Sequence, residues 1–123
     1  ASGTYKITNG DLTLDAQGNP NAVWYFQAES SLTVDSPAAS RSVKLIGGAL
    51  AKNVYWYVGS TAVINYGGGG VMVGTIIANS GVTLSSPGNS TTPVGQETVL
   101  NGRAISLVAS VTMVNTIINI PAN

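Results

Sequence analysis

The sequence contains no cysteine and no histidine. Without cysteine the chain has no disulfides and no thiolate ligands for zinc, and without histidine it lacks the usual general base of serine and cysteine hydrolases. These absences argue against the common classes of hydrolase and against thiolate zinc sites. We therefore expect a protein that is not an enzyme, with no catalytic residues, no metal site and no cofactor.

Charge is also scarce, because charged residues make up only 8% of the chain and the formal net charge is zero. Proteins that bind nucleic acid neutralise phosphates with Lys and Arg, so this composition disfavours such a partner. No apolar run approaches the ~18 residues that a membrane-spanning helix needs, so we expect no membrane span. The low charge, with Ala1 in place of Met, favours a secreted, extracellular protein.

Helix signals are almost missing from the sequence. Short segments rich in Val, Ile, Thr and Tyr alternate between apolar and polar residues and are bounded by Gly, Asn, Pro and Ser, which is the pattern of β-strands. No shift in composition marks a domain boundary. Residues 1–123 are therefore predicted to form one all-β domain, large enough to bury a core.

A ten-residue phrase occurs five times, and its last part reads small residue, apolar, Thr, apolar. The copies are Tyr5–Leu14, Tyr25–Val34, Tyr55–Ile64, Thr75–Leu84 and Ala104–Met113. Repeats of this kind indicate stacked supersecondary units, here a β-solenoid. The ninth positions are separated by 20, 30, 20 and 29 residues. About 20 residues suit one coil with three short faces, and the two longer intervals leave the coil boundaries open.

Alternation along each copy sorts the side chains into columns, because successive residues of a strand point to opposite faces. Four columns are apolar at every level and are predicted to form the core. Their members are Phe26/Trp56/Ile76/Ile105, Ala28/Val58/Ala78/Leu107, Leu12/Leu32/Ala62/Val82/Val111 and Leu14/Val34/Ile64/Leu84/Met113.

Four phrases together resemble the microbial ice-binding-protein family and cover nearly the whole chain. They are LDAQGNPNAVWYFQ (Leu14–Gln27), AKNVYWYVGSTAVI (Ala51–Ile64), VGTIIANSGVTL (Val73–Leu84) and LNGRAISL (Leu100–Leu107). The resemblance implies a discontinuous right-handed β-helix of roughly triangular section that adsorbs to ice.

The resemblance matches only the C-terminal half of the usual family domain. Members usually carry an N-terminal stretch about as long again, with further coils and a long helix packed along one face. Nothing in this sequence corresponds to that stretch, so we expect a solenoid without the long helix. The chain is then either a fragment or a short relative that completes itself by assembly.

Two outward columns of the repeated strand form the predicted ice-binding face. Stacked strands place equivalent residues ~4.8 Å apart, so small hydroxyls and methyls would form a flat surface. The predicted residues are Thr13, Thr33, Val63, Thr83 and Thr112, with Ser31, Thr61 and Ser110 beside them. The alternative is that these threonines are good strand residues that form a ladder without any ligand.

Two aspartates offer a different function. The repeat alignment places Asp15 and Asp35 one strand apart, near the ~5–5.5 Å that separates the carboxyl groups of a retaining glycosidase. No cluster of Arg, Lys or aromatic sugar platforms accompanies them in the sequence. The interpretation as a non-enzymatic protein is therefore retained.

A further column suggests contact between copies of the chain. Tyr25, Tyr55 and Thr75 are predicted to point outward, with Tyr57 and Ile77 beside them, and a row of exposed apolar groups usually marks an interface. The alternative is that a loop partly covers these aromatic side chains.

The solenoid ends provide open strand edges that pair readily with another copy. The strand Gly3–Ile7 and the tail Val114–Pro121 are candidates for head-to-tail contact or strand exchange, with fraying as the alternative. The alternative function is thus a self-assembling extracellular filament or adhesin subunit. Its candidate residues are Tyr25, Tyr55, Tyr57, Ile77, Ile117, Ile118 and Ile120.

Overall fold

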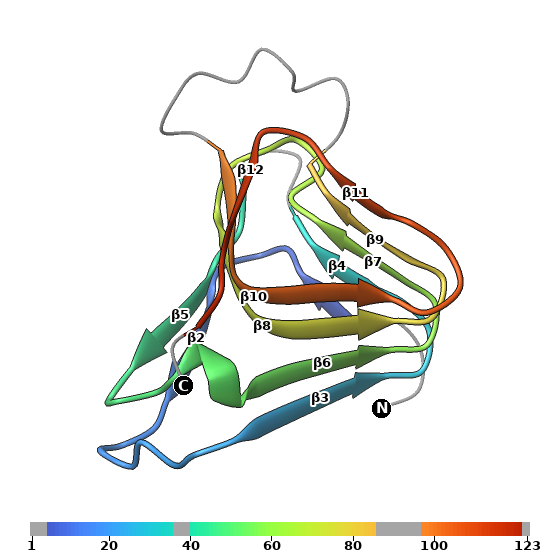
Figure 1. Cartoon of the computed structure of the whole chain (residues 1–123). Helices are drawn as coiled ribbons and strands as arrows, with labels where there is room; N and C mark the ends of the chain where they lie inside the picture. The colour runs from blue at the N-terminus through green and yellow to red at the C-terminus, as the bar shows by residue number, and fades with distance from the viewer. Residues whose placement is uncertain (1–4, 36–39, 86–96, 122–123) are drawn as a thin grey trace.

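The computed structural model describes residues 5–35, 40–85 and 97–121, which form short strands joined by tight corners (Figure 1). The elements are β1 (Tyr5–Ile7), β2 (Leu12–Asp15), β3 (Trp24–Ala28), β4 (Leu32–Val34), β5 (Val43–Ile46), the 3-10 turn η1 (Ala51–Asn53), β6 (Val54–Val58), β7 (Thr61–Ile64), β8 (Val71–Ala78), β9 (Gly81–Leu84), β10 (Thr98–Ser106), β11 (Val111–Met113) and β12 (Thr116–Asn119). Within these ranges the structure contains no α-helix, and therefore none long and apolar enough to cross a bilayer.

The strands stack into three sides of a triangle. The first sheet has the order β1-β4-β7-β9-β11, the second has the order β12-β10-β8-β6-β3, and β2 pairs with β5 in a third, two-stranded sheet. Figure 1 shows the triangular outline. The pairs are parallel, as in a chain that returns to the same side once per coil. The predicted all-β solenoid is confirmed.

β8 and β10 are longer than the other strands because each turns a corner of the triangle (Figure 1). Their first residues lie on the side of β5, where the amide of Val71 donates to the hydroxyl of Ser42 at 3.0 Å. Their last residues continue the second sheet beside β6. The 30- and 29-residue intervals of the sequence are single coils, because β4 pairs directly with β7 and β9 pairs directly with β11.

The core follows the predicted columns through the middle coils. In the first sheet the inward residues of β4, β7 and β9 are at most 1% exposed, and Trp56, Ile76 and Ala78 are buried against them. The Trp56 indole N–H donates to the carbonyl of Val73 at 2.8 Å, and its ring stacks on Phe26 at 4.2 Å between centroids. A buried tryptophan needs such a partner for its N–H group.

The predicted core positions of the last level are wrong in two places. Ile105 and Leu107 are 41% and 64% exposed, because the register pairs Ala104 with Ile76 and Ser106 with Ala78. The step from Ser106 to Val111 is one residue longer than the step from Ala78 to Val82. The repeat alignment was anchored on Thr112 and did not allow for this extra residue. It therefore assigned inward positions to Ile105 and Leu107, which point outward.

Two other predicted core columns also change. Leu12 and Leu14 pair with Val43 and Leu45 in the third sheet, so they are core residues of a different side. Met113 pairs with Leu84 as predicted but remains 50% exposed, because no described strand lies beyond β11.

One inward column becomes smaller from the N-terminal to the C-terminal coil. The register aligns Trp24, Val54, Gly74 and Gly102. Gly74 has a φ of +108°, and a Cβ there would lie 2.7 Å from the carbonyl oxygen of Val54. A Cβ on Gly102 would overlap the backbone of Gly74. Glycine is required at this corner because the neighbouring backbones approach so closely.

Polar side chains hold the remaining corners together. The amide of Asn65, fully buried, accepts from the N–H of Arg41 at 2.8 Å and donates to its carbonyl at 2.9 Å. One coil further on, the buried hydroxyls of Ser85 and Thr98 lie 2.8 Å apart. Each polar group thus has the partner that burial demands.

Asp11 links the segment before β2 to the segment that begins β5, at the start of the third sheet. Its carboxylate accepts from the backbone N–H of Ser42 at 2.8 Å and lies 3.0 Å from the Lys44 ammonium. The hydrogen bond from Ser42 and then the bond to Lys44 hold the pKa of Asp11 below its usual value.

We expect Gly102→Ala to lower the free energy of unfolding by about 1–3 kcal/mol, as for other overpacked interiors. Gly10→Ala is the matched control, because a Cβ at Gly10 meets nothing within 4 Å, and a change within about 0.5 kcal/mol is expected there. Urea titration of the two variants and the parent measures both. Equal stability of the two variants would contradict the close approach of the coils at Gly102.

Asp11 should make stability depend on acid pH. Its pKa is lowered in the folded state, so its contribution is present above the unfolded pKa near ~4 and is lost as pH falls through the folded value. In Asp11→Asn, Tm at neutral pH should be lower and the fall of Tm with acid shallower. Lys44→Met should remove only part of this effect, because the Ser42 amide remains. If the Tm of Asp11→Asn fell with decreasing pH in parallel with that of the parent, the predicted contribution of Asp11 to stability would be refuted.

Candidate functional site

The outer face of the first sheet carries a row of threonines. The register aligns the middle residues of its strands, Lys6, Thr33, Val63, Thr83 and Thr112. These side chains point outward, because the residues on either side of them along each strand point inward. We call Thr33, Val63, Thr83 and Thr112 the threonine row. Their predicted alignment is confirmed.

Thr13 does not belong to the threonine row, in contrast to the prediction. It lies in β2 and pairs with Lys44 of the third sheet. The coil from Lys6 to Thr33 spans 27 residues, because it includes the corner after β2. The pattern Leu-Thr-Leu suits an outward threonine on any side of a solenoid, so it did not show which side β2 occupies.

Lys6 takes the position that was predicted for Thr13, at the N-terminal end of the row. No motif around Lys6 marks it, since Tyr-Lys-Ile is simply a strand with an outward polar residue. Only the pairing of Tyr5 with Leu32 shows that β1 continues this sheet. The row therefore consists of three threonines and a valine, with the exposed Lys6 beside its N-terminal end.

A second column of small residues widens the face, as predicted for Ser31, Thr61 and Ser110. Thr61 pairs with Gly81, and the carbonyls of Ser31 and Ser110 accept from Tyr5 and Val82 at 2.9 and 3.1 Å. Each member precedes the threonine row by two residues, ~6.6 Å along the strand. Asp11 occupies the same position in the first copy of the repeat as Ser31 does in the second, but it lies just before β2 and not in this column.

The two outward columns give the first sheet an outer surface of small hydroxyl and methyl groups. Its hydroxyls and methyls alternate at strand spacing on backbones that are hydrogen-bonded to neighbouring coils. Among the positions of the two columns that the structure describes, Lys6 carries the only charge. Such a surface can hold water molecules in fixed positions.

The outer face of the second sheet is aromatic. Tyr25, Tyr55 and Thr75 align as predicted, and Tyr57 and Ile77 align beside them. The rings of Tyr25 and Tyr55 stack at 5.3 Å between centroids, and Tyr57 lies 6.3–6.4 Å from both. Tyr25, at the edge of the sheet, is 64% exposed. The column continues to Arg103 at the other end.

The predicted pair of Asp15 and Asp35 does not form. Asp15 lies in the third sheet opposite Ile46 and accepts from the N–H of Gln17 at 2.8 Å, whereas the amide of Asp35 bonds to Ile7 beside the first sheet. The two carboxylates therefore sit on different sides, and the glycosidase spacing is absent. Among the described residues no group of three or more Asp and Glu side chains is placed to hold a metal ion.

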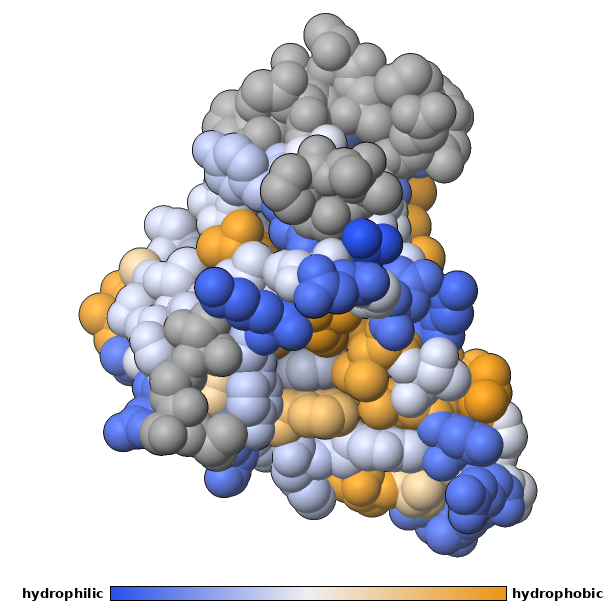
Figure 2. Space-filling view, turned by 180° about the vertical axis from the view of Figure 1, so that it is seen from behind, coloured by the Kyte–Doolittle hydropathy of each residue, from blue (hydrophilic) through white to orange (hydrophobic). Residues whose placement is uncertain are grey.

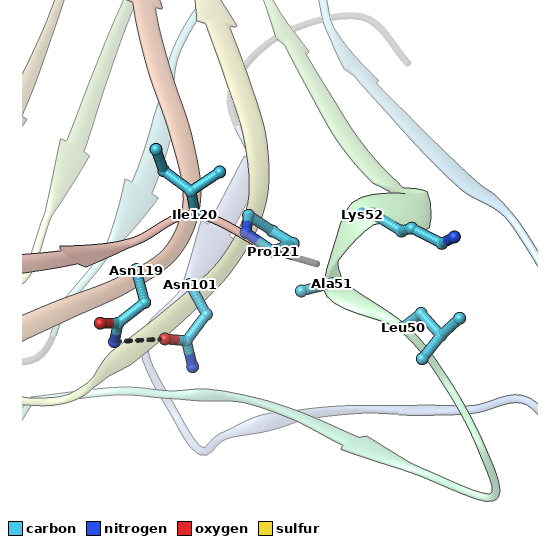
Figure 3. Close-up of a pocket in the computed structure, with 7 residues that line it drawn as sticks. All are labelled: Leu50, Ala51, Lys52, Asn101, Asn119, Ile120 and Pro121. Carbon is cyan, nitrogen blue, oxygen red and sulfur yellow. Dashed lines mark hydrogen bonds between the residues drawn. The ribbon is translucent and has the colours of Figure 1, made fainter. Parts of the chain in front are cut away.

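The predicted contact residues of the tail lie in and just beyond β12. Ile117 and Ile118 pair with Val99 and Leu100, so Ile118 shares the inward column of Leu100, and Ile120 follows the strand. Beside them is a cavity of about 320 Å³ (Figure 3). Its lining comes from η1, β10 and the tail: Leu50, Ala51, Lys52, Asn101, Asn119, Ile120 and Pro121. Asn119 donates to Asn101 at 2.9 Å across one wall.

Comparison with protein families places this architecture among known sequences. A family model described as Ice-binding-like matches residues 1–119. An ice-binding protein of Nostoc sp. is 38% identical over 85% of this chain, which corresponds to 33% of the relative. One of Colwellia sp. is 33% identical over 94% of this chain and 41% of the relative.

Solved structures show the same fold. A crystal structure of an ice-binding protein from an Antarctic biological consortium superposes with a TM-score of 0.79 at 33% identity, over 98% of this chain and 47% of that one. The ice-binding protein 1 domain of Shewanella frigidimarina gives 0.77 at 26% identity, over 100% and 49%. The chain thus spans less than half the length of these relatives.

Proposed function

Since the chain belongs to the ice-binding-like family, we propose that it binds ice through the outer face of its first sheet. The observation that carries the proposal is the threonine row, in which Thr33, Val63, Thr83 and Thr112 stand in register on four parallel strands. The column of Ser31, Thr61 and Ser110 makes the contact surface two residues wide.

The proposed mechanism is adsorption without a chemical reaction. Threonine methyl groups expose apolar surface that orders the adjacent water, while the hydroxyls anchor some of those molecules by hydrogen bonds. The inter-coil ladder holds these groups in place before ice is met, so little conformational entropy is lost on contact. Val63 keeps the β-branched shape of threonine and supplies methyl groups only.

The other two sides suit ice less well. The second sheet presents bulky tyrosine rings, and the third presents Lys44 paired with Asp11. A charged group keeps its own hydration shell, which is expensive to remove. The first sheet is the side with the fewest such obstacles. Adsorption to ice is also consistent with a secreted, extracellular location, which we propose for this domain.

A second candidate function is self-assembly into an extracellular filament or adhesin module. The specific observation in its favour is the stack of Tyr25, Tyr55 and Tyr57 on the outside of the second sheet. Exposed tyrosines are common anchors of protein interfaces. The two functions are compatible, because this stack and the threonine row lie on different sides.

The ice proposal is tested by placing a bulky ring on the row. Thr33→Tyr and Thr83→Tyr should lower thermal hysteresis and ice shaping by about tenfold or more, because the ring clashes with a flat ice surface. Thr13→Tyr is the matched control, since it makes the same change in the third sheet, and it should keep the activity of the parent. Circular dichroism verifies that all three variants are folded.

Two results would contradict the ice proposal. A parent protein that shapes no ice crystals would remove its basis altogether. If Thr13→Tyr were as damaging as Thr83→Tyr, the contact surface would not be the first sheet.

Substitution of tyrosines by lysine tests whether the stack of Tyr25, Tyr55 and Tyr57 takes part in self-association. Tyr25→Lys combined with Tyr57→Lys should weaken self-association about tenfold or more, as expected for the loss of interface anchors. Light scattering over a concentration series measures this, and Thr13→Lys on the third sheet is the control. Unchanged association in the double variant would show that this face takes no part.

A further inference from the structure

The corner that follows β7 contains a fully buried asparagine. Asn65 comes directly after Ile64, the last residue of β7, and its backbone has a φ of +47°. Figure 2 shows hydrophilic side chains on the surface of the molecule, whereas this amide lies inside it. A buried amide is costly unless its oxygen and its nitrogen both find partners. The contacts of Asn65 therefore indicate what the residue contributes.

Asn65 bonds through both its side chain and its backbone. Its side-chain oxygen accepts from the N–H of Arg41 at 2.8 Å, and its side-chain nitrogen donates to the carbonyl of Arg41 at 2.9 Å. Its backbone N–H donates to the carbonyl of Val34, and its own carbonyl accepts from the N–H of Gly68 at 2.7 Å. The side chain thus pairs with the backbone of Arg41 as a neighbouring strand would.

These bonds connect two sides of the triangle. Val34 ends β4 in the first sheet, whereas Arg41 lies just before β5 of the third sheet. Arg41 is held in turn by its own side chain, because its Nε donates to the carbonyl of Thr8 at 2.9 Å. Asn65 therefore fixes the end of β7 against both neighbouring segments.

The loop between β7 and β8 closes tightly over this amide pair. Gly70 has a φ of +75°, and a Cβ there would lie 2.5 Å from Nδ2 of Asn65 and 2.6 Å from the carbonyl oxygen of Arg41. A side chain at position 70 would therefore push the Asn65 amide away from Arg41.

The following coil has a similar corner built from smaller groups. Ser85 comes directly after β9, is fully buried and has a φ of +66°. Its hydroxyl lies 2.8 Å from the hydroxyl of Thr98, the first residue of β10. Both β7 and β9 are thus followed by a buried polar residue in the left-handed conformation that is bonded to another segment.

The apolar pattern alone does not fix the register of β7. Successive residues of a strand point to opposite faces, so a shift of two residues leaves the inward and outward sets unchanged. Such a shift would place Thr61, in place of Val63, opposite Thr33. It would also carry Asn65 ~6.6 Å along the strand, away from Arg41, and leave a buried amide unpaired.

We propose that Asn65 is a positioning residue of the ice-binding face, which holds Val63 at its place in the threonine row through the amide pair with Arg41. The functional part of this inference rests on the ice proposal above. β7 lies between β4 and β9 in the first sheet, so the amide pair is internal to the solenoid. A single buried asparagine sets the register of some coiled coils in a comparable way.

Asn65→Gly tests the proposal, because glycine accepts the left-handed backbone and only the amide is lost. The backbone amides of β7 should then exchange with solvent about tenfold faster relative to those of β6, as expected for local opening after the loss of two hydrogen bonds. Thermal hysteresis and ice shaping should be largely lost, because Val63 is no longer held in line with Thr33 and Thr83.

Val54→Ala is the control for stability. Val54 is fully buried at the start of β6, away from the first sheet (Figure 1). The cavity should lower Tm by several degrees, yet the variant should keep the ice shaping of the parent. Circular dichroism near the freezing point verifies that this variant and Asn65→Gly are folded where ice is assayed.

Gly70→Ala disturbs the amide pair in a second way. Its Cβ should displace the Asn65 amide, so its hydrogen exchange and ice shaping should resemble those of Asn65→Gly. Gly48→Ala is the matched control, because Gly48 has a φ of +86° and a Cβ there meets nothing within 4 Å. Both substitutions strain a left-handed backbone, and only the first adds a collision.

Two results would overturn the proposal. One is a folded Asn65→Gly variant whose β7 amides exchange no faster, relative to those of β6, than in the parent. The other is ice shaping by Asn65→Gly equal to that of Val54→Ala, which would leave Asn65 a purely structural role. A parent that shapes no ice would end the ice proposal, while faster exchange confined to β7 would still support the positioning of Val63 by Asn65.

Discussion

Parallel stacking of the coils in register is the constraint on which this protein depends. Each strand of the first sheet hydrogen-bonds to the equivalent strand of the next coil, and this ladder repeats at ~4.8 Å. A residue type placed at one position therefore meets its counterpart in the neighbouring coils. Inward positions form continuous apolar columns, and outward positions form rows.

The ladder also fixes the geometry of the proposed ice-binding face, on which Lys6 is the one charged residue among the described positions. A single exposed threonine has no preference for ordered water, but Thr33, Val63, Thr83 and Thr112 are held by the backbone in one line. The side chains inherit their spacing from hydrogen bonds that are already formed. The same rigidity has a cost at the corners, where Gly74 and Gly102 are required because the backbones of adjacent coils nearly touch.

Each side of the triangle has a separate character. The first sheet is small and hydroxylated, the second carries stacked tyrosines, and the third carries the Asp11–Lys44 ion pair. The ends differ from all three, because they expose core residues such as Met113 and Ile118. The proposed ice-binding face and the proposed self-association face therefore do not compete for the same residues.

The sequence by itself determined the solenoid, most of its core and four positions of the threonine row, because strand alternation and the repeated phrase are local and survive in the chain. It did not determine which side of the triangle a strand occupies. Leu-Thr-Leu at Leu12–Leu14 has the same pattern as Leu-Thr-Val at Leu32–Val34, yet only the coil length places the first in the third sheet. One additional residue between Ser106 and Val111 likewise reversed the predicted orientation of Ile105 and Leu107. Corner length and register are set by the packing of one coil on the next, so only the tertiary structure decided that Lys6, and not Thr13, ends the row.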